Sequence, residues 1–171
     1  MFWKRLKKKK QRDFWSFMEY KNYEGSVISL KRYPEKKVPA VVEEQLHFVE
    51  NQGIQGDFHA DGKERQISLL TLEEKEWMDS KEEKGFCFKK YKENLLIEGL
   101  SLQECQEGDI LICGDVVLEI SASVKSCHPE LCSLAVSGEA CILAGSSKFA
   151  KVQKGGSIER GMKVQLKRNG R

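Results

Sequence analysis

Two cysteines in one short loop carry the side chains of this sequence that are best suited to covalent chemistry. Cys127 and Cys132 follow an apolar run, and Lys125 and His128 stand beside them. Nearby cations favour the thiolate, which is the nucleophilic and metal-binding form of cysteine. Cys132 and Cys127 are therefore the candidate catalytic residues. The alternative is an ordinary pair of thiols packed into a short helical turn.

The remaining cysteines predict packing and a reducing compartment. Cys87, Cys105 and Cys113 flank apolar residues, so we expect them to be small buried hydrophobes. A structural zinc site would use the His and Cys side chains between positions 127 and 141, but this segment lacks the usual C-x2-C pairing. Because no apolar signal region or membrane-spanning run is visible, we expect a cytoplasmic protein with reduced thiols.

A second group of polar residues surrounds a turn that contains Gly53 and Gly56. Glycines at such positions allow positive φ or a close approach of the backbone to a ligand. Asp57 and His59 are two residues apart, so both would face one side of an extended segment. The pair could bind a metal or a cofactor, although a hydrogen-bonded turn is the more typical use of these residues.

Two further polar residues stand next to predicted strands. Arg65 precedes a buried strand, and its guanidinium group suits phosphate or carboxylate recognition. Its alternative role is a surface ion pair with Glu64 or Glu73. Asn94 could hydrogen-bond the polar edge of a ligand or close a turn.

Common nucleotide and hydrolase chemistries find no support in the sequence. Lys154-Gly155-Gly156 is typical of a phosphate-binding turn and equally of an ordinary bend before a strand. There is no Walker motif, no dinucleotide-binding fingerprint and no serine nucleophile elbow.

Charge divides the chain into two parts. Residues 1–12 contain seven Lys or Arg and no acid, which leaves 22 basic and 26 acidic side chains in the remainder. We expect a basic, aromatic arm over residues 1–23 and one mildly acidic domain over residues 24–171. We favour a solvated arm that docks some aromatic side chains on the domain; contact with a membrane or a nucleic acid is the weaker alternative.

The pattern of elements predicts a mainly β fold. Thr71 and Glu74 form a capping box, which predicts a helix from this point to Gly85. Many short strands with glycine turns, one main helix and short helical turns favour a β-barrel over alternating βαβ units. The expected strands are residues 25–33, 45–50, 67–70, 94–97, 109–113, 116–121 and 163–167.

Taken in order, several motifs resemble the MOSC domain, the C-terminal module of molybdenum-cofactor sulfurases that also occurs as small stand-alone bacterial proteins. Their order and spacing cover about residues 24–168. The motifs are GIQGDFHA at 53–60, RQISLL at 65–70, ENL at 93–95, EGL at 98–100, GD at 108–109, KSCH at 125–128, Cys132, FAKV at 149–152 and GGSI at 155–158.

The resemblance implies a MOSC-like β-barrel and a role in sulfur or molybdenum-cofactor chemistry centred on a cysteine thiolate. Carried over by position, Cys132 is the first choice for the reactive thiol and for the molybdenum ligand, and Cys127 is its competitor. The residues that would hold the molybdopterin are Arg65, Asn94, Lys125, Asp57 and His59. Pyridoxal phosphate belongs to the desulfurase domain of larger family members, and no lysine site for it is visible in this chain.

We therefore expect a protein that carries sulfur as a persulfide or binds a molybdopterin-type cofactor, with sulfur-transfer or molybdenum-cofactor-linked activity. The expected partners are a cysteine desulfurase as sulfur donor and a molybdoenzyme. The alternative is a non-catalytic binding or assembly module that kept the barrel without the chemistry.

Overall fold

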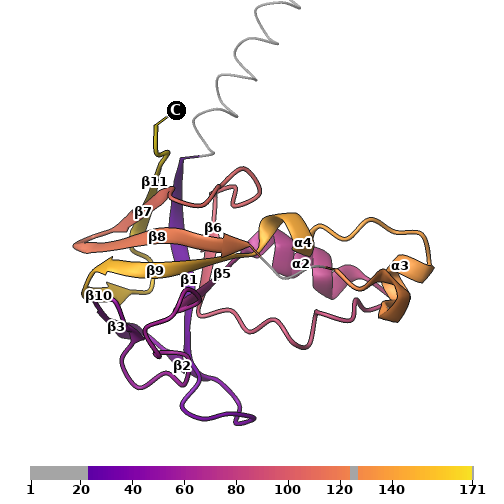
Figure 1. The fold of residues 1–171 in the computed structure, drawn as a ribbon, viewed down its shortest axis with the longest axis horizontal. Coiled ribbons are helices and arrows are strands. Elements are labelled where there is room, and N and C mark those ends of the chain that lie inside the picture. The colour runs from indigo at the N-terminus through magenta and orange to yellow at the C-terminus, as the bar shows by residue number, and fades with distance from the viewer. Residues whose placement is uncertain (1–22, 124–126, 171) are drawn as a thin grey trace, which may run out of the picture.

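The computed structural model describes residues 23–123 and 127–170, which form the mainly β fold that the sequence predicts (Figure 1). In this part of the chain seven strands close a barrel. They are β1 (Glu24–Arg32), β5 (Ile67–Thr71), β6 (Leu95–Glu98), β7 (Ile110–Cys113), β8 (Val116–Ser123), β9 (Lys148–Lys154) and β11 (Lys163–Lys167). β2 (Val41–Glu43) pairs with β1, and a separate sheet contains β10 (Gly156–Glu159), β3 (Gln45–Val49) and β4 (Gly53–Ile54).

The barrel closes because β1 pairs with both β6 and β11. From β1 the order around the barrel is β11, β7, β8, β9, β5 and β6. β5 and β6 run parallel, and parallel neighbours require a crossover, which α2 (Leu72–Ser80) and the loop after it provide. Val27, Ile97 and Leu118 belong to the fully or almost fully buried core, where each such side chain contributes about 1.5–3 kcal/mol.

The predicted capping box at the start of α2 is confirmed. The hydroxyl of Thr71 accepts a hydrogen bond from the backbone N–H of Glu74 at 3.3 Å. In return, the backbone N–H of Thr71 donates to the Glu74 carboxylate at 2.9 Å. These two bonds satisfy donors that a helix N-terminus otherwise leaves unpaired.

The predicted end of this helix at Gly85 is wrong, because α2 stops at Ser80 and the next residue is already extended. The Lys84 ammonium group folds back and donates to the backbone carbonyls of Met78 and Asp79 at 3.2 and 2.9 Å. These carbonyls at the end of the helix are therefore satisfied by a side chain instead of by another helical turn.

Strands β9 and β10 were not expected from the sequence, and Gly155 lies where one passes into the other. A Cβ atom on Gly155 would lie 2.6 Å from the Phe48 carbonyl oxygen, so glycine permits β9 and β10 to approach β3. This contact gives Lys154-Gly155-Gly156 the role of a bend between two strands, which was one of its two predicted roles.

The segment between β8 and β9 forms the short helical turns η1 (Pro129–Leu131), α3 (Ser133–Val136) and α4 (Leu143–Ser146). These helices and α2 lie together beyond one end of the strands, on the right-hand side of Figure 1. A small apolar cluster centred on Leu70, Met78, Leu96 and Leu143 packs separately from the barrel core. No described helix is long and apolar enough to cross a membrane. Nearly all of the predicted arm, residues 1–22, lies outside the described residues.

Candidate functional site

Cys132 lies at the junction between η1 and α3, with its side chain almost buried at 7% exposure. Its sulfur accepts a hydrogen bond from the backbone N–H of Phe86 at 3.4 Å. This bond lowers the pKa of the Cys132 thiol, the N–H groups of Ala135 and Leu134 act in the same direction, and desolvation opposes them. The geometry therefore favours a thiolate at this position.

Cys132 opens onto a small recess that has thiols on several sides. Its walls come from residues 85–88, 127–128, 141 and 143–144, together with Cys132 itself. Four of the described cysteines are among these residues: Cys87, Cys127, Cys132 and Cys141. The recess encloses about 20 Å³, which is room for little more than a water molecule. It is therefore sized for a few atoms.

The cysteines predicted to be ordinary buried hydrophobes divide into two kinds. Cys105 and Cys113 are buried in the barrel core, and desolvation raises the pKa of each thiol to about 11. For these two the prediction is confirmed. Cys87 differs from the prediction because it is only half-buried and lines the recess. Desolvation nevertheless raises its pKa, and the other recess thiols raise it further.

Asp57 has a fully buried carboxylate that holds the glycine turn against β1. One oxygen accepts from the Tyr33 backbone N–H at 2.8 Å and from the Asn94 amide at 3.0 Å. The other accepts from the His59 backbone N–H at 2.7 Å and bonds its ring Nδ1 at 3.0 Å. Burial raises the pKa of Asp57, but the hydrogen bonds from His59 and Tyr33 outweigh it and leave the pKa below its ordinary value.

Asn94 is buried, and its side chain bonds groups on β1, on β5 and in the turn that follows β4. Its amide nitrogen also donates to the Lys31 carbonyl at 3.1 Å. Its oxygen accepts from the backbone N–H of Ser68 at 3.0 Å and from the Ser68 hydroxyl at 2.8 Å. Two donated and two accepted bonds use the full capacity of this amide. The predicted use of Asn94 in ligand recognition stays a prediction, as it does for Asp57 and His59.

Arg65 is half-buried, and its guanidinium group lies 4.9 Å from the centre of the Phe149 ring. This stacking is a cation–π contact. Among the described residues Arg65 makes neither of its two expected ion pairs, and Glu64 instead pairs with Lys151 at 2.7 Å. Lys125, the remaining predicted cofactor-binding residue, lies outside the described residues.

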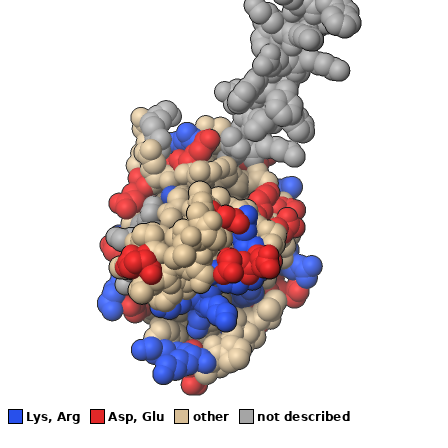
Figure 2. Space-filling view, turned by 90° about the vertical axis from the view of Figure 1, so that its right-hand side faces the viewer, with Lys and Arg blue, Asp and Glu red and all other residues tan. Residues whose placement is uncertain are grey.

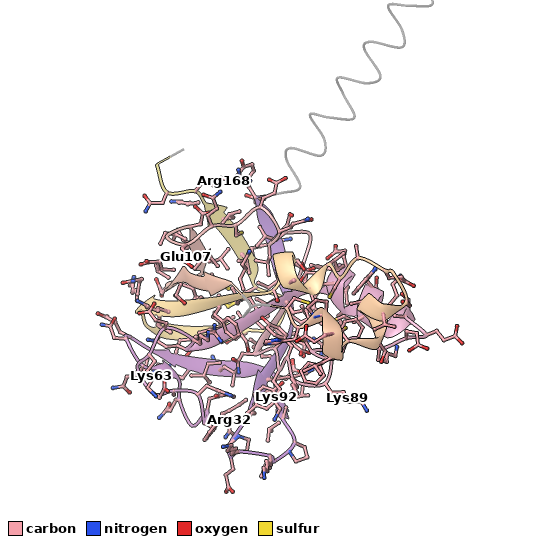
Figure 3. All side chains as sticks on the ribbon, turned by 45° about the vertical axis from the view of Figure 1, so that its right-hand side comes forward. Arg32, Lys63, Lys89, Lys92, Glu107 and Arg168 are labelled. Atoms are coloured by element: carbon pink, nitrogen blue, oxygen red, sulfur yellow. The ribbon has the colours of Figure 1, made fainter. Side chains whose placement is uncertain are left out.

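The loop from α2 to β6 carries lysines that lie over aromatic rings, a basic and aromatic border that was not predicted from the sequence. Lys90 lies 3.7 Å from the centre of the Phe86 ring, and Lys92 lies 5.4 Å from that of Tyr33. In Figure 3, Lys89, Lys92 and Arg32 follow the lower side of the molecule from the helices toward the strands. The alternation of Lys and aromatic residues over 84–92 was a signal that could have indicated this border.

The predicted site residues therefore fall into two groups. Cys132 and Cys127 line the recess, whereas Asp57, His59 and Asn94 belong to a hydrogen-bond network that is not part of its walls.

Figure 2 looks onto the side with the helices and shows an uncharged area bordered by side chains of both signs. Within residues 23–123 and 127–170, no three His, Cys, Asp or Glu side chains are arranged to hold a metal ion.

Comparison with solved structures shows a shared fold. The YuaD protein from Bacillus subtilis superposes with a TM-score of 0.61 at 17% identity, covering 84% of this chain and 95% of that one. YiiM from Geobacillus stearothermophilus gives a TM-score of 0.55 at 19% identity, covering 85% of this chain and 76% of that one. No curated protein sequence matches the chain. The sequence model of the MOSC domain matches residues 55–165, and on this match the chain belongs to the MOSC domain family.

Proposed function

We propose that the protein is a sulfur carrier that holds sulfane sulfur as a persulfide on Cys132. The observation that carries the proposal is the hydrogen bond from the Phe86 N–H to the Cys132 sulfur, which favours the thiolate inside a recess of a few atoms' volume. A thiolate is the attacking form in sulfur exchange. The walls of the recess around Cys132 are mainly apolar.

The loading step is an exchange between two sulfur atoms that needs no external oxidant. The Cys132 thiolate attacks the outer sulfur of a donor persulfide, R–S–SH. The S–S bond of the donor breaks, the donor leaves as the thiolate R–S⁻, and Cys132 becomes Cys–S–SH. The Phe86 N–H stays hydrogen-bonded to the sulfur and stabilises the attacking anion.

The proposed donor is a protein, and we assign this role to a cysteine desulfurase. Two large apolar side chains flank Cys132 on the outer surface of η1 and α3: Leu131 is 60% exposed and Val136 is 79% exposed. Exposed apolar groups beside a reactive residue favour contact with a protein surface. A molybdoenzyme is the proposed acceptor of the sulfur.

Molybdopterin binding is a second candidate, supported by the same Cys132 thiolate as a metal ligand. The described groups do not fit a pterin in their present arrangement, because the recess is too small and Asn94 already uses its amide bonds. A thiolate ligand on this domain would supply a strong donor bond to the metal, and Arg65 is the arginine of the predicted set that would contact the pterin phosphate.

A desulfurase-charging experiment tests the sulfur-carrier function. The wild type, Cys132→Ala and Cys141→Ala are incubated anaerobically with a cysteine desulfurase and L-cysteine, and their intact masses are measured. Cys141 is the matched control because it is another thiol of the same recess. In samples quenched with acid directly after charging, we expect the wild type and Cys141→Ala to carry one added sulfur atom that dithiothreitol removes, and Cys132→Ala to carry none.

Two other outcomes of this experiment would overturn the proposal. Equal loading of Cys132→Ala would place the sulfur elsewhere. No loading of any variant, combined with slow alkylation of Cys132 at neutral pH, would favour the non-catalytic binding or assembly module. Molybdenum and pterin are measured in the same preparations, and stoichiometric amounts that disappear in Cys132→Ala would favour the cofactor-binding role.

A further inference from the structure

The recess holds more thiols than a simple carrier needs. Loading and unloading a persulfide by exchange with partner proteins requires one cysteine, yet Cys127, Cys87 and Cys141 line the same recess as Cys132. The described cysteines are all free thiols. The additional thiols are therefore candidates for a second reaction with a sulfur atom bound to Cys132.

Exposure separates the three additional thiols. Cys87 and Cys141 are half-buried and pack against the small apolar cluster between α2 and α4. Cys127 is exposed and still lines the recess. An exposed thiol on a loop can move toward a neighbouring sulfur atom without opening a packed cluster, because it gives up few contacts.

A short helical turn, η1, lies between Cys127 and Cys132, and both cysteines line the recess. The backbone N–H of Leu131 donates to the His128 carbonyl at 3.1 Å, and that of Cys132 donates to the Pro129 carbonyl at 3.2 Å. These bonds make the backbone between the two cysteines compact. A disulfide needs Cα atoms within about 7 Å, so the exposed loop at Cys127 has to reach this distance before the bond closes.

We propose that Cys127 is a resolving thiol that releases the sulfur held on Cys132 as sulfide and closes an internal disulfide. This inference rests on the proposed persulfide at Cys132. The Cys127 thiolate attacks the Cys132 sulfur, the bond to the outer sulfur breaks, and HS⁻ leaves. The outer sulfur is reduced to sulfide, and the two cysteines are oxidised to Cys127–S–S–Cys132. A protein dithiol of the thioredoxin class then reduces the disulfide and restores both thiols.

The arrangement gives the two cysteines different tasks. Cys132 is almost buried, and the Phe86 N–H stabilises its sulfur as the leaving or attacking anion. Cys127 reaches both the recess and the solvent, so its disulfide with Cys132 stays accessible to a reducing protein. The product of this step is therefore free sulfide, in place of a persulfide exchanged between two proteins.

Single-turnover sulfide release tests this role. Wild type, Cys127→Ser and the control Cys141→Ser are loaded anaerobically with glutathione persulfide and desalted, and sulfide is then measured without added reductant. We expect the wild type and Cys141→Ser to release one sulfide per loaded persulfide and to yield a peptide that joins Cys127 to Cys132. Release from Cys127→Ser should be lost while its persulfide persists, and Cys127→Ala should behave in the same way.

Three results would overturn the inference. Equal release from the wild type and both Cys127 variants would show that Cys127 is not required. A disulfide mapped to Cys141 or Cys87 would assign resolution to another thiol. A stable persulfide on wild-type Cys132 without sulfide release would remove the resolving step and leave the carrier function standing, whereas no persulfide on Cys132 would remove both.

Discussion

The carboxylate of Asp57 should be a large contributor to stability, and Asp57→Asn is the substitution that measures it. This change keeps the shape of the side chain but replaces one carboxylate oxygen by an NH₂ group. Each oxygen now accepts a backbone N–H, from Tyr33 or from His59, at 2.8 and 2.7 Å. Whichever way the new amide turns, its NH₂ group faces one of these donors.

The magnitude follows from the bonds that are lost. Hydrogen bonds to a charged group contribute about 1.5–3 kcal/mol each, and a buried donor left unpaired costs a similar amount. One such backbone bond is removed and the others lose their charge assistance, so the free energy of unfolding should fall by roughly 3 kcal/mol at pH 7. Urea unfolding followed by circular dichroism measures this difference, with the exposed Asp115→Asn as the control.

The dependence on pH provides an independent check. Because the pKa of Asp57 is lowered in the folded protein, its stabilisation is present above the unfolded pKa of about 3.9 and is lost as pH falls through the folded pKa. The difference between wild type and Asp57→Asn should therefore narrow below about pH 4. A difference under about 1 kcal/mol at pH 7, or one that stays constant from pH 7 to 3, would refute the reasoning.

Two further predictions concern the recess and the contact of Gly155 with β3. The rate of iodoacetamide alkylation at Cys132, followed by peptide mapping, should reach half its maximum at a lower pH than that of a cysteine in a short unstructured peptide, since the pKa of Cys132 is lowered; an equal or higher midpoint would contradict the assignment. Gly155→Ala should lower the free energy of unfolding by about 1–3 kcal/mol, because its Cβ would meet the Phe48 carbonyl oxygen. The control Gly145→Ala in α4 should leave the free energy of unfolding unchanged or raise it, because no atom lies within 4 Å of the new Cβ. Equal effects of the two glycine substitutions in urea unfolding would count against the packing argument.

The barrel was predictable because its strands carry local signals, and the strands that were missed lack them. Residues 45–50 alternate in hydrophobicity and residues 67–70 form a continuous apolar run, and both became strands. β9 has the sequence KFAKVQK, in which Lys148 is buried, so its pattern does not match a half-buried strand. Its place in the sheet comes from pairing with β5 and β8, which a single segment does not reveal.

The candidate site was predictable in its thiols and much less so in its polar groups. Cys132 and Cys127 were identified because reactive side chains are rare and stand close together. The Phe86 N–H that bonds Cys132 could not be identified, because it is a backbone donor 46 residues away and every residue except proline has one. For Asp57 and Asn94 the sequence allows both ligand binding and a structural hydrogen-bonded turn, because the same residue types form buried networks, and sequence alone does not separate the two uses.

The hydrogen bond between Phe86 and Cys132 is compatible with a persulfide on Cys132, but a bound cofactor could disrupt it. The recess has room for about one water molecule, and a single sulfur atom bound to Cys132 is of comparable size. A pterin could reach the same thiolate if residues 85–88, which form one wall of the recess, moved away. That movement would break the Phe86 hydrogen bond, which is the first cause of the lowered pKa of Cys132. In a cofactor-bound form reached in this way, a bound metal would have to replace the stabilisation of the thiolate that the Phe86 N–H provides.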